Sequence, residues 1–310
     1  MYFPIIRGRQ YDLLALRELQ SKGLLSKKII PIIEPIKLNP TRLSTVNMFE
    51  ERERNLIIIT NPKVGSFTGE IAIPSIYQKF KEMMSSHVVI FAHRLNEDSE
   101  NQIINLQKEF DVNLENLAII HSERNYIPFY KEIFETVNPW INVIPTDSSF
   151  KRQLRGQQLV GLDDKFNKLS RNVDYLEKIS EFYSEEHLFF EEEGYFGFSD
   201  FTIVGKEYSE GGFAPYAVAI HIVYPNKENS LGVMHFVSES NSDTSDPAGK
   251  FAEALDKLIE WYRSVPDERM DTLAMQCFVK HYEEGTYPGL PTLKKLSIMH
   301  HLELMGKLLG

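Results

Sequence analysis

The chain has 310 residues, which suits one large domain or two smaller ones. Its 42% hydrophobic and 25% charged residues are the balance of a globular protein and exclude disorder as the main state. A net charge of −10 argues against nonspecific binding of nucleic acid by the chain alone, so we expect such contact only through a partner or a local basic patch.

The N-terminal apolar run is too short for a signal peptide, because it reaches Arg7 at once. No run in the sequence approaches the roughly 20 apolar residues that a membrane span requires. The single cysteine, Cys277, excludes a disulfide within the chain and a cysteine-based metal site. We therefore expect a cytoplasmic protein without a membrane anchor.

Short apolar runs alternate with longer amphipathic stretches over the first two thirds of the chain. The eight runs are residues 2–6, 29–33, 56–60, 88–92, 117–120, 141–144, 158–162 and 201–204. Because they lack polar alternation, both faces of each strand should be buried, as in a parallel sheet covered by helices. Helices are predicted between them, among others at residues 11–22, 75–85, 100–110, 127–137 and 174–183.

Eight strands alternating with helices predict an α/β fold, a (β/α)₈ barrel of the TIM type. The alternative is an open doubly wound sheet, which is less favoured because no glycine-rich fingerprint follows the first strand.

The alternation ends near residue 205. Residues 217–224 and 231–237 predict an antiparallel hairpin, and helices are predicted at residues 248–262, 271–281 and 293–309. We therefore expect a barrel over residues 1–205. Residues 206–310 should form a β-hairpin and helical extension packed on it as one compact unit.

Polar residues follow most of the apolar runs, at the end of a barrel where active sites lie. The ligand-binding candidates are Arg7, Lys37, Asn61, Arg94 and Asp200, joined by His221 on the predicted hairpin. The catalytic candidates are Glu34, His121 and Asp163. A mouth that mixes cations with carboxylates suits an anionic small molecule, a phosphate ester or a nucleotide. The alternative is that strand ends are polar simply because water begins there.

Glu34 follows an apolar strand that would hold it near the barrel axis. Its carboxylate is a candidate general base if burial raises its pKa. The alternative is a structural ion pair with Lys37 or Arg7.

The two predicted hairpin strands carry His221 and His235, which we expect to face each other. Two imidazoles with Asp163 or Asp200 are a conceivable site for a divalent ion. However, no compact HxH or HExxH spacing is present, so we assign no metal ligand and expect hydrogen-bonded structural histidines. No P-loop, dinucleotide fingerprint or nucleophile elbow identifies a cofactor or a reaction.

Several segments resemble the bacterial beta family proteins, especially an uncharacterised branch usually encoded beside a second partner gene. They are MYFPIIRGRQ (1–10), LALREL (14–19), PIIEPIK (31–37), GFSDF (197–201), AIH (219–221) and YPGLPTLKKLSIMHH (287–301). The resemblance spans nearly the whole chain and implies a TIM-barrel-like fold. It also implies a protein partner encoded nearby and a role in phage defence with a nuclease-like partner, but no reaction.

Two functions of different classes follow. In one, Arg7, Lys37 and Arg94 bind a phosphate-bearing small molecule or nucleic-acid end, and Glu34 or His121 acts as the acid or base. In the other, the chain is a noncatalytic ligand sensor, regulator or scaffold that binds its partner. A deep charged mouth would favour the enzyme, whereas an exposed apolar face on the hairpin or the last helix would favour the binding subunit.

Overall fold

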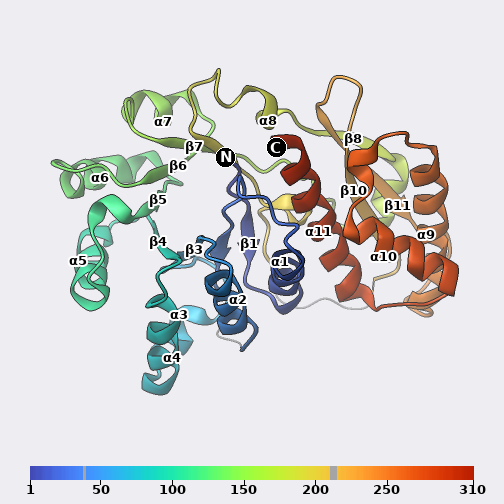
Figure 1. Ribbon diagram of the computed structural model, residues 1–310, viewed down its shortest axis with the longest axis horizontal. Coiled ribbons are helices and arrows are strands. Elements are labelled where there is room, and N and C mark those ends of the chain that lie inside the picture. The colour runs from blue at the N-terminus through green and yellow to red at the C-terminus, as the bar shows by residue number, and fades with distance from the viewer. Residues whose placement is uncertain (38–39, 210–214) are drawn as a thin grey trace. The chain divides into compact units, whose positions relative to one another are not determined.

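Eight parallel strands form the first sheet of the computed structural model, which describes residues 1–37, 40–209 and 215–310 (Figure 1). In hydrogen-bonded order they are β1 (Ile5–Arg7), β2 (Ile32–Glu34), β3 (Leu56–Ile59), β4 (Val89–Arg94), β5 (Ala118–Ile120), β6 (Ile141–Pro145), β7 (Leu159–Leu162) and β9 (Gly197–Ser199). A parallel bridge between Tyr2 and Phe198 brings β9 back to the start of β1. This nearly closed barrel with intervening helices confirms the predicted fold class.

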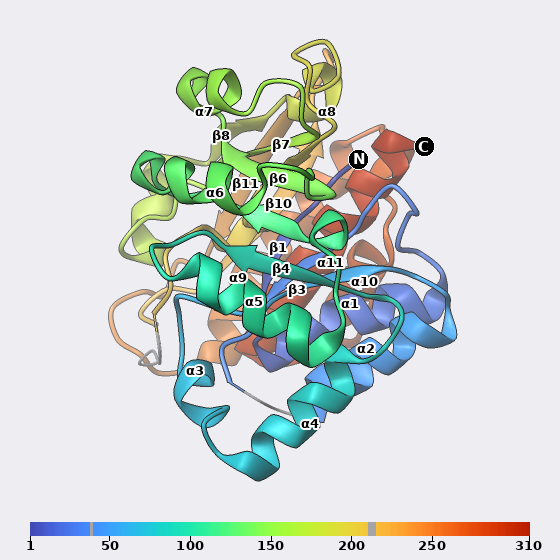
Figure 2. The ribbon, with the colours of Figure 1, turned by 90° about the vertical axis from the view of Figure 1, so that its left-hand side faces the viewer.

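Helices follow the barrel strands, as the amphipathic stretches predict. They are α1 (Gln10–Lys22), α2 (Pro40–Glu51), α3 (Phe67–Glu70), α4 (Pro74–Met84), α5 (Ser99–Phe110), α6 (Ile127–Ile133) and α7 (Ser148–Gln153). Figure 2 shows α5 and α6 on the outside of the strands. The ring of Phe110 on α5 meets that of Phe91 on β4 at 5.1 Å between centroids, so apolar contact holds this layer together.

The chain divides into two compact units. The first comprises residues 1–13, 27–163 and 189–200 and contains every barrel strand. The second comprises residues 14–26, 164–188 and 201–310. It therefore includes two stretches that precede residue 205, and one of them supplies a strand to its own sheet.

The second unit is built on an antiparallel sheet in the order β10-β11-β8. Its elements are β8 (Ser180–Ser184), β10 (Ala219–Pro225), β11 (Leu231–Val237), α9 (Pro247–Ser264), α10 (Leu273–Glu284) and α11 (Leu290–Leu309). The register of β10 and β11 pairs His221 with His235, which confirms the predicted hairpin and its facing histidines. Along α11 the apolar stripe Leu293, Leu296, Met299 and Leu302 is buried, so this face of the helix is covered by the chain itself.

The prediction of a strand at residues 201–204 is wrong. Residues Thr202–Val204 form a short 3-10 helix, and Thr202 has a φ of 53°, which an extended strand does not permit. The eighth barrel strand is β9, which begins at Gly197. A Cβ at that position would lie 2.6 Å from the carbonyl oxygen of Met1 and 2.7 Å from the ring of Phe3, so only glycine lets β9 close the barrel.

The prediction of a helix at residues 174–183 is also wrong. Residues Asn172–Glu177 form a 3-10 helix, and β8 follows it. Pairing of β8 with β11 outweighs the local helical pattern, because a strand gains its hydrogen bonds from a distant segment. The short connecting helix α8 (Glu186–Phe189) then leads back toward β9.

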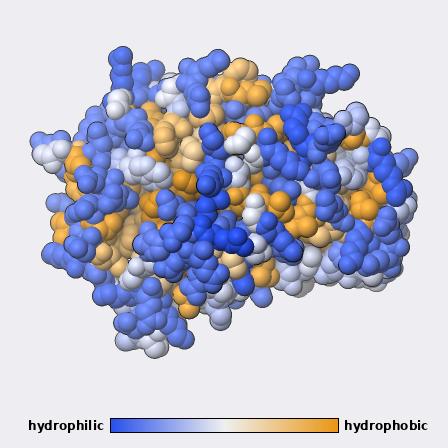
Figure 3. Space-filling model, in the orientation of Figure 1, coloured by the Kyte–Doolittle hydropathy of each residue, from blue (hydrophilic) through white to orange (hydrophobic). Residues whose placement is uncertain are grey.

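On the face drawn in Figure 3, apolar residues lie in small separate patches among hydrophilic ones. Scattered apolar residues of this kind are normal on protein surfaces. Among the helices of the described residues, none has both the length and the apolarity needed to cross a bilayer.

Candidate functional site

The alternation of side chains along β4 decides which of its residues reach the inside of the barrel. Phe91 contacts Phe110 on α5, and His93 bonds the first residue of α5, so both side chains face the helices. Arg94 therefore faces inward. There it meets Glu34, which comes from the C-terminal end of β2.

Arg7, Glu34 and Arg94 form one ion cluster at the C-terminal ends of their strands, which we call the barrel mouth. One carboxylate oxygen of Glu34 accepts a hydrogen bond from Nη1 of Arg7, and the other lies 3.1 Å from Nη2 of Arg94. The backbone N–H of Lys63 also donates to Glu34, at 3.2 Å. The exposed fractions of Arg7, Glu34 and Arg94 are 6%, 1% and 9%, so the cluster is nearly closed to water.

Glu34 therefore forms the structural ion pair with Arg7 that was one of its two predicted roles. A buried carboxylate held between two guanidinium groups is stabilised in its charged form. Burial lowers the pKa of Arg94 to about 10, which still leaves it charged at neutral pH. The two arginines thus fix the carboxylate of Glu34, and its negative charge compensates their buried positive charges.

Arg42 is a fully buried cation near the mouth that the sequence analysis missed. Its Nη2 donates to the carbonyl oxygen of Lys37, and its guanidinium lies 5.3 Å from the centroid of the Phe67 ring. Burial lowers its pKa to about 10. The side chain of Lys37 itself is exposed. No sequence signal distinguishes Arg42 from the surface arginines of a helix.

Asn61 follows β3 and holds the backbone at the end of β4. Its Oδ1 accepts from the N–H of Arg94, and its Nδ2 donates to the carbonyl oxygen of Arg94, both at 2.8 Å. Nδ2 also lies 3.2 Å from Oε1 of Gln102. With both ends of its amide engaged, Asn61 positions Arg94.

His121 points into the layer between strands and helices, away from Glu34. Its ring contacts Tyr130 at 5.0 Å and Phe150 at 6.2 Å between centroids. Nε2 lies 2.8 Å from Oδ1 of Asn142, whose Nδ2 donates to Gln157. Because Oδ1 can only accept, Nε2 carries the proton. Burial lowers the pKa of His121 to about 4, so the ring is neutral at pH 7.

The two aspartate candidates lie near the closure of the barrel. Asp200 is 4% exposed and accepts a hydrogen bond of 2.6 Å from the hydroxyl of Tyr2. Asp163 follows β7, and its N–H donates to the carbonyl oxygen of Ser199 at 3.2 Å. Asp200 thus ties the start of β1 to the end of β9.

His221 belongs to the second unit, where its Nδ1 lies 2.7 Å from Nδ1 of His235. One Nδ1 must donate and the other accept, so only one of the two Nδ1 atoms carries a proton. Oε1 of Glu181 lies 3.4 Å from Nε2 of His235 but without hydrogen-bond geometry. The ring of Tyr175 packs against both imidazoles, and burial lowers the pKa of His221 to about 3.

The predicted site residues therefore do not form one site. Arg7, Glu34 and Arg94 meet at the mouth, whereas His121 and His221 lie in other environments. Glu34 thus has no histidine of this set as its acid–base partner. Within residues 1–37, 40–209 and 215–310, no three His, Cys, Asp or Glu side chains gather as a metal ion would require.

Comparisons with protein families, with characterised proteins and with solved structures find no match to this chain.

Proposed function

We propose that the chain is a ligand-sensing, regulatory or scaffold subunit of a bacterial phage-defence gene pair, which binds a nuclease-like partner encoded beside it. The resemblance to beta family proteins supports the gene pairing and the defence setting. The observation that carries the binding role is a set of exposed apolar side chains on and just before an edge strand of the second unit.

Leu176, Ile179 and Phe182 line this strip, which we call the β8 strip. Their exposed fractions are 44%, 62% and 63%, and the last two are the highest among the large apolar side chains of the described residues. Single exposed apolar residues need no explanation, but these three fall within one short segment at the edge of the sheet. Exposed apolar side chains beside an unpaired strand edge favour contact with another protein.

The sheet geometry leaves Phe182 uncovered. Phe182 and Tyr224 both lie opposite Gly232, so their side chains share one face of the sheet. Trp261 of α9 contacts Tyr224 at 5.5 Å between ring centroids, so α9 covers this face over β10. Phe182 lies at the edge, on β8, and stays exposed. Edge strands accept an added strand from a partner. We expect an extended apolar segment of the partner to pair with β8 and to pack on Phe182.

The barrel mouth supports the same proposal. Arg7 and Arg94 both bind Glu34 in a nearly closed cluster, and His121 is neutral and faces the helices. General acid–base catalysis needs a group within hydrogen-bond reach of the substrate. The arrangement of these residues therefore favours a structural role for the cluster.

The alternative is an enzyme that acts on a phosphate-bearing small molecule or nucleic-acid end at the barrel mouth. The observation that favours it is the place of Glu34 between two arginines at the strand ends, where barrel enzymes hold their reacting groups. Under this alternative the exposed mouth cations, Lys37 and Lys63, attract the phosphate.

Binding of the neighbouring gene's product, measured with purified proteins by native mass spectrometry and titration, tests the proposal. We expect a stoichiometric complex that the double variant Ile179→Ser/Phe182→Ser weakens at least about tenfold, because it removes the apolar contact. Ile73→Ser is the matched control, since Ile73 is 49% exposed in the barrel unit. Lys37→Ala/Lys63→Ala should bind normally.

The absence of a complex with the wild-type chain would contradict the proposal. So would a double variant that binds as tightly as the wild type. Loss of activity on a phosphate-bearing substrate in Lys37→Ala/Lys63→Ala would instead support the enzyme.

A further inference from the structure

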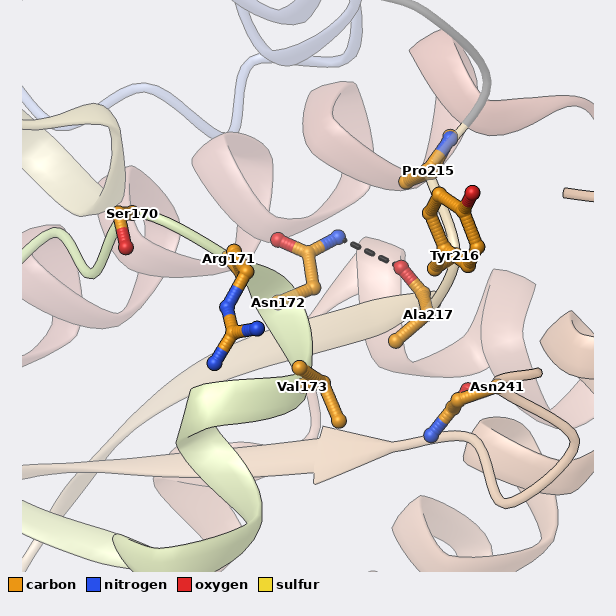
Figure 4. Close-up of a pocket in the computed structure, with 8 residues that line it drawn as sticks. All are labelled: Ser170, Arg171, Asn172, Val173, Pro215, Tyr216, Ala217 and Asn241. Carbon is orange, nitrogen blue, oxygen red and sulfur yellow. Dashed lines mark hydrogen bonds between the residues drawn. The ribbon is translucent and has the colours of Figure 1, made fainter. Parts of the chain in front are cut away.

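The second unit contains a pocket of about 460 Å³ that no predicted site residue lines. Residues 170–173 form one side, residues 215–217 a second and Asn241 a third (Figure 4). The volume falls in the range of small-molecule sites, roughly 300–1,000 Å³. Val173, Pro215 and Ala217 give the lining an apolar part. The pocket shares no lining residue with the β8 strip or the barrel mouth.

Hydrogen bonds between distant segments hold the pocket walls. Nδ2 of Asn172 donates to the carbonyl oxygen of Ala217 at 2.8 Å and joins the first two sides, as Figure 4 shows. Asn241 is fixed by Ser238, because its Oδ1 accepts from the hydroxyl at 2.6 Å and its Nδ2 donates to the carbonyl oxygen at 2.7 Å. The pocket is therefore formed before any ligand enters, which lowers the ordering cost of binding.

Arg171 supplies a positioned cation at this pocket. Its Nε and Nη2 donate to the carboxylate of Asp174 at 3.1 and 2.6 Å, and these bonds raise the pKa of Arg171. Asp174 thereby fixes the plane of the guanidinium, while the side chain remains 73% exposed. The Nη1 edge has no hydrogen bond within the described residues, so its donors face a ligand or water. Phosphate and carboxylate groups bind guanidinium edges of this kind.

Tyr216 and Asn172 supply the contacts that a planar ring would use. The side chain of Tyr216 is 59% exposed, which is high for an aromatic residue and leaves a ring face open. Aromatic faces stack with nucleobases. Oδ1 of Asn172 has no donor among the described residues, although Nδ2 is used, so it can accept from a ring N–H.

We propose that this pocket binds a nucleotide, a heteroaromatic ring that carries a phosphate group. The ring stacks on Tyr216, a ring N–H donates to Oδ1 of Asn172, and the phosphate binds the free edge of Arg171. Arg171 and Asn172 come from one side of the pocket and Tyr216 from the second, so a ligand needs both the ring and the anion to use all three contacts. The proposal stands whether or not the chain binds a protein partner.

Isothermal titration calorimetry of the full chain tests this assignment. The probes are the four common ribonucleoside 5′-monophosphates, the corresponding nucleosides and inorganic phosphate. We expect at least one monophosphate to bind with a Kd on the order of 10–100 µM. Its nucleoside should bind at least about tenfold more weakly, and inorganic phosphate more weakly still.

Pocket variants locate the site. Tyr216→Ala should weaken the monophosphate about tenfold, and Tyr216→Phe should not, because the ring remains. Arg171→Gln should weaken the monophosphate but leave the nucleoside unchanged. Val173→Trp should abolish binding by filling the pocket. Tyr282→Ala is the matched control in the same unit, because Tyr282 is 38% exposed and does not line the pocket.

Either of two results would overturn the proposal. One is no detectable binding of any monophosphate at about 1 mM to a folded wild-type chain. The other is binding that Tyr216→Ala, Arg171→Gln and Val173→Trp all leave unchanged, since the ligand would then occupy another place. Circular dichroism of each variant separates a lost contact from a lost fold.

Discussion

The barrel mouth and the pocket of the second unit each contain an arginine paired with a carboxylate, but the first pair is buried and the second is exposed to solvent. At the mouth, the side chains of Glu34 and Arg94 are 1% and 11% exposed and bind each other. In the second unit, Asp174 holds an arginine, Arg171, whose side chain is 73% exposed. The first pair is closed to solvent. The second pair faces solvent, and Nη1 of Arg171 keeps N–H donors that no described residue uses.

The difference in solvent exposure distinguishes a structural ion cluster from an arginine that is accessible to a ligand. Charged residues at the ends of barrel strands suggest chemistry by their position, but burial and mutual pairing decide whether they are available. By the same criterion, the β8 strip and the pocket carry the surfaces that remain open to another molecule. Substitutions in the closed cluster should therefore change stability, whereas substitutions in the β8 strip or the pocket should change binding.

The largest expected effect is acid destabilisation, because buried neutral histidines occur in both units. Burial lowers the pKa of His93 and His121 to about 4 in the barrel, and of His300 to about 4 in the second unit. The unfolded chain takes up these protons below about pH 6.5, and the folded chain does not, so stability is lost as pH falls from there toward 4. Between pH 7.5 and 5.0 we expect each of the three histidines to lower the unfolding free energy by about 2 kcal/mol, which makes about 6 kcal/mol together.

Urea denaturation at the two pH values measures this effect. His121→Leu should reduce the loss by about 2 kcal/mol relative to the wild-type chain. His87→Leu is the control, because His87 is exposed and its hydrogen bond with Glu53 raises its pKa, which gives the opposite sign. A pH dependence that His121→Leu leaves unchanged would mean that His121 is not a buried neutral group.

The next effect concerns the closed cluster. Glu34→Gln leaves two buried guanidinium groups without their carboxylate and should lower the unfolding free energy by about 3–5 kcal/mol. Glu284→Gln, in the exposed pair with Lys280, should change it by less than about 0.5 kcal/mol. Urea denaturation at pH 7.5 compares the two. A loss below about 1 kcal/mol for Glu34→Gln would show that the mouth is open to water and would reopen it as a binding site.

A smaller effect sharpens the account of the sheet edge. A Cβ at Gly232 would lie 2.7 Å from the ring of Tyr224, which passes over β11 to place its hydroxyl 3.0 Å from Oγ of Ser180 on β8. Gly232→Ala should cost about 1–3 kcal/mol of unfolding free energy and weaken the attachment of β8. Thermal denaturation and limited proteolysis measure both.

The control for this substitution is Gly69→Ala, since nothing lies within 4 Å of a Cβ at Gly69. It should leave stability unchanged or raise it slightly. Equal stability of Gly232→Ala and wild type would contradict the packing of Tyr224 across β11.

Much of the barrel could be predicted from the sequence, because parallel strands buried on both faces are continuous apolar runs. The run at residues 56–60, for example, became β3. β9 escaped detection because Gly197 is needed for close packing against Phe3, and a glycine weakens any strand pattern. β8 escaped because its partner, β11, lies about fifty residues along the chain and its own sequence looks helical.

The site was only partly predictable. The pairing of Glu34 with Arg7 was one of two predicted roles, since both follow strands that are neighbours in the barrel. The role proposed for His121 depended on which way its side chain points, and that follows from register rather than from composition. Pocket residues such as Asn172 and Ala217 are 45 residues apart and carry no motif, so only folding reveals that they meet.

Hydrogen-exchange mass spectrometry, with and without the neighbouring gene's product, tests the central claim most directly. The claim is that the chain acts through the open surface of its second unit and not through the barrel mouth. We expect amide protection on complex formation to concentrate in residues 176–184, which contain the β8 strip. Protection confined to the segments that follow the barrel strands, at residues 34–37, 61–66 and 121–124, would contradict the account and return function to the mouth.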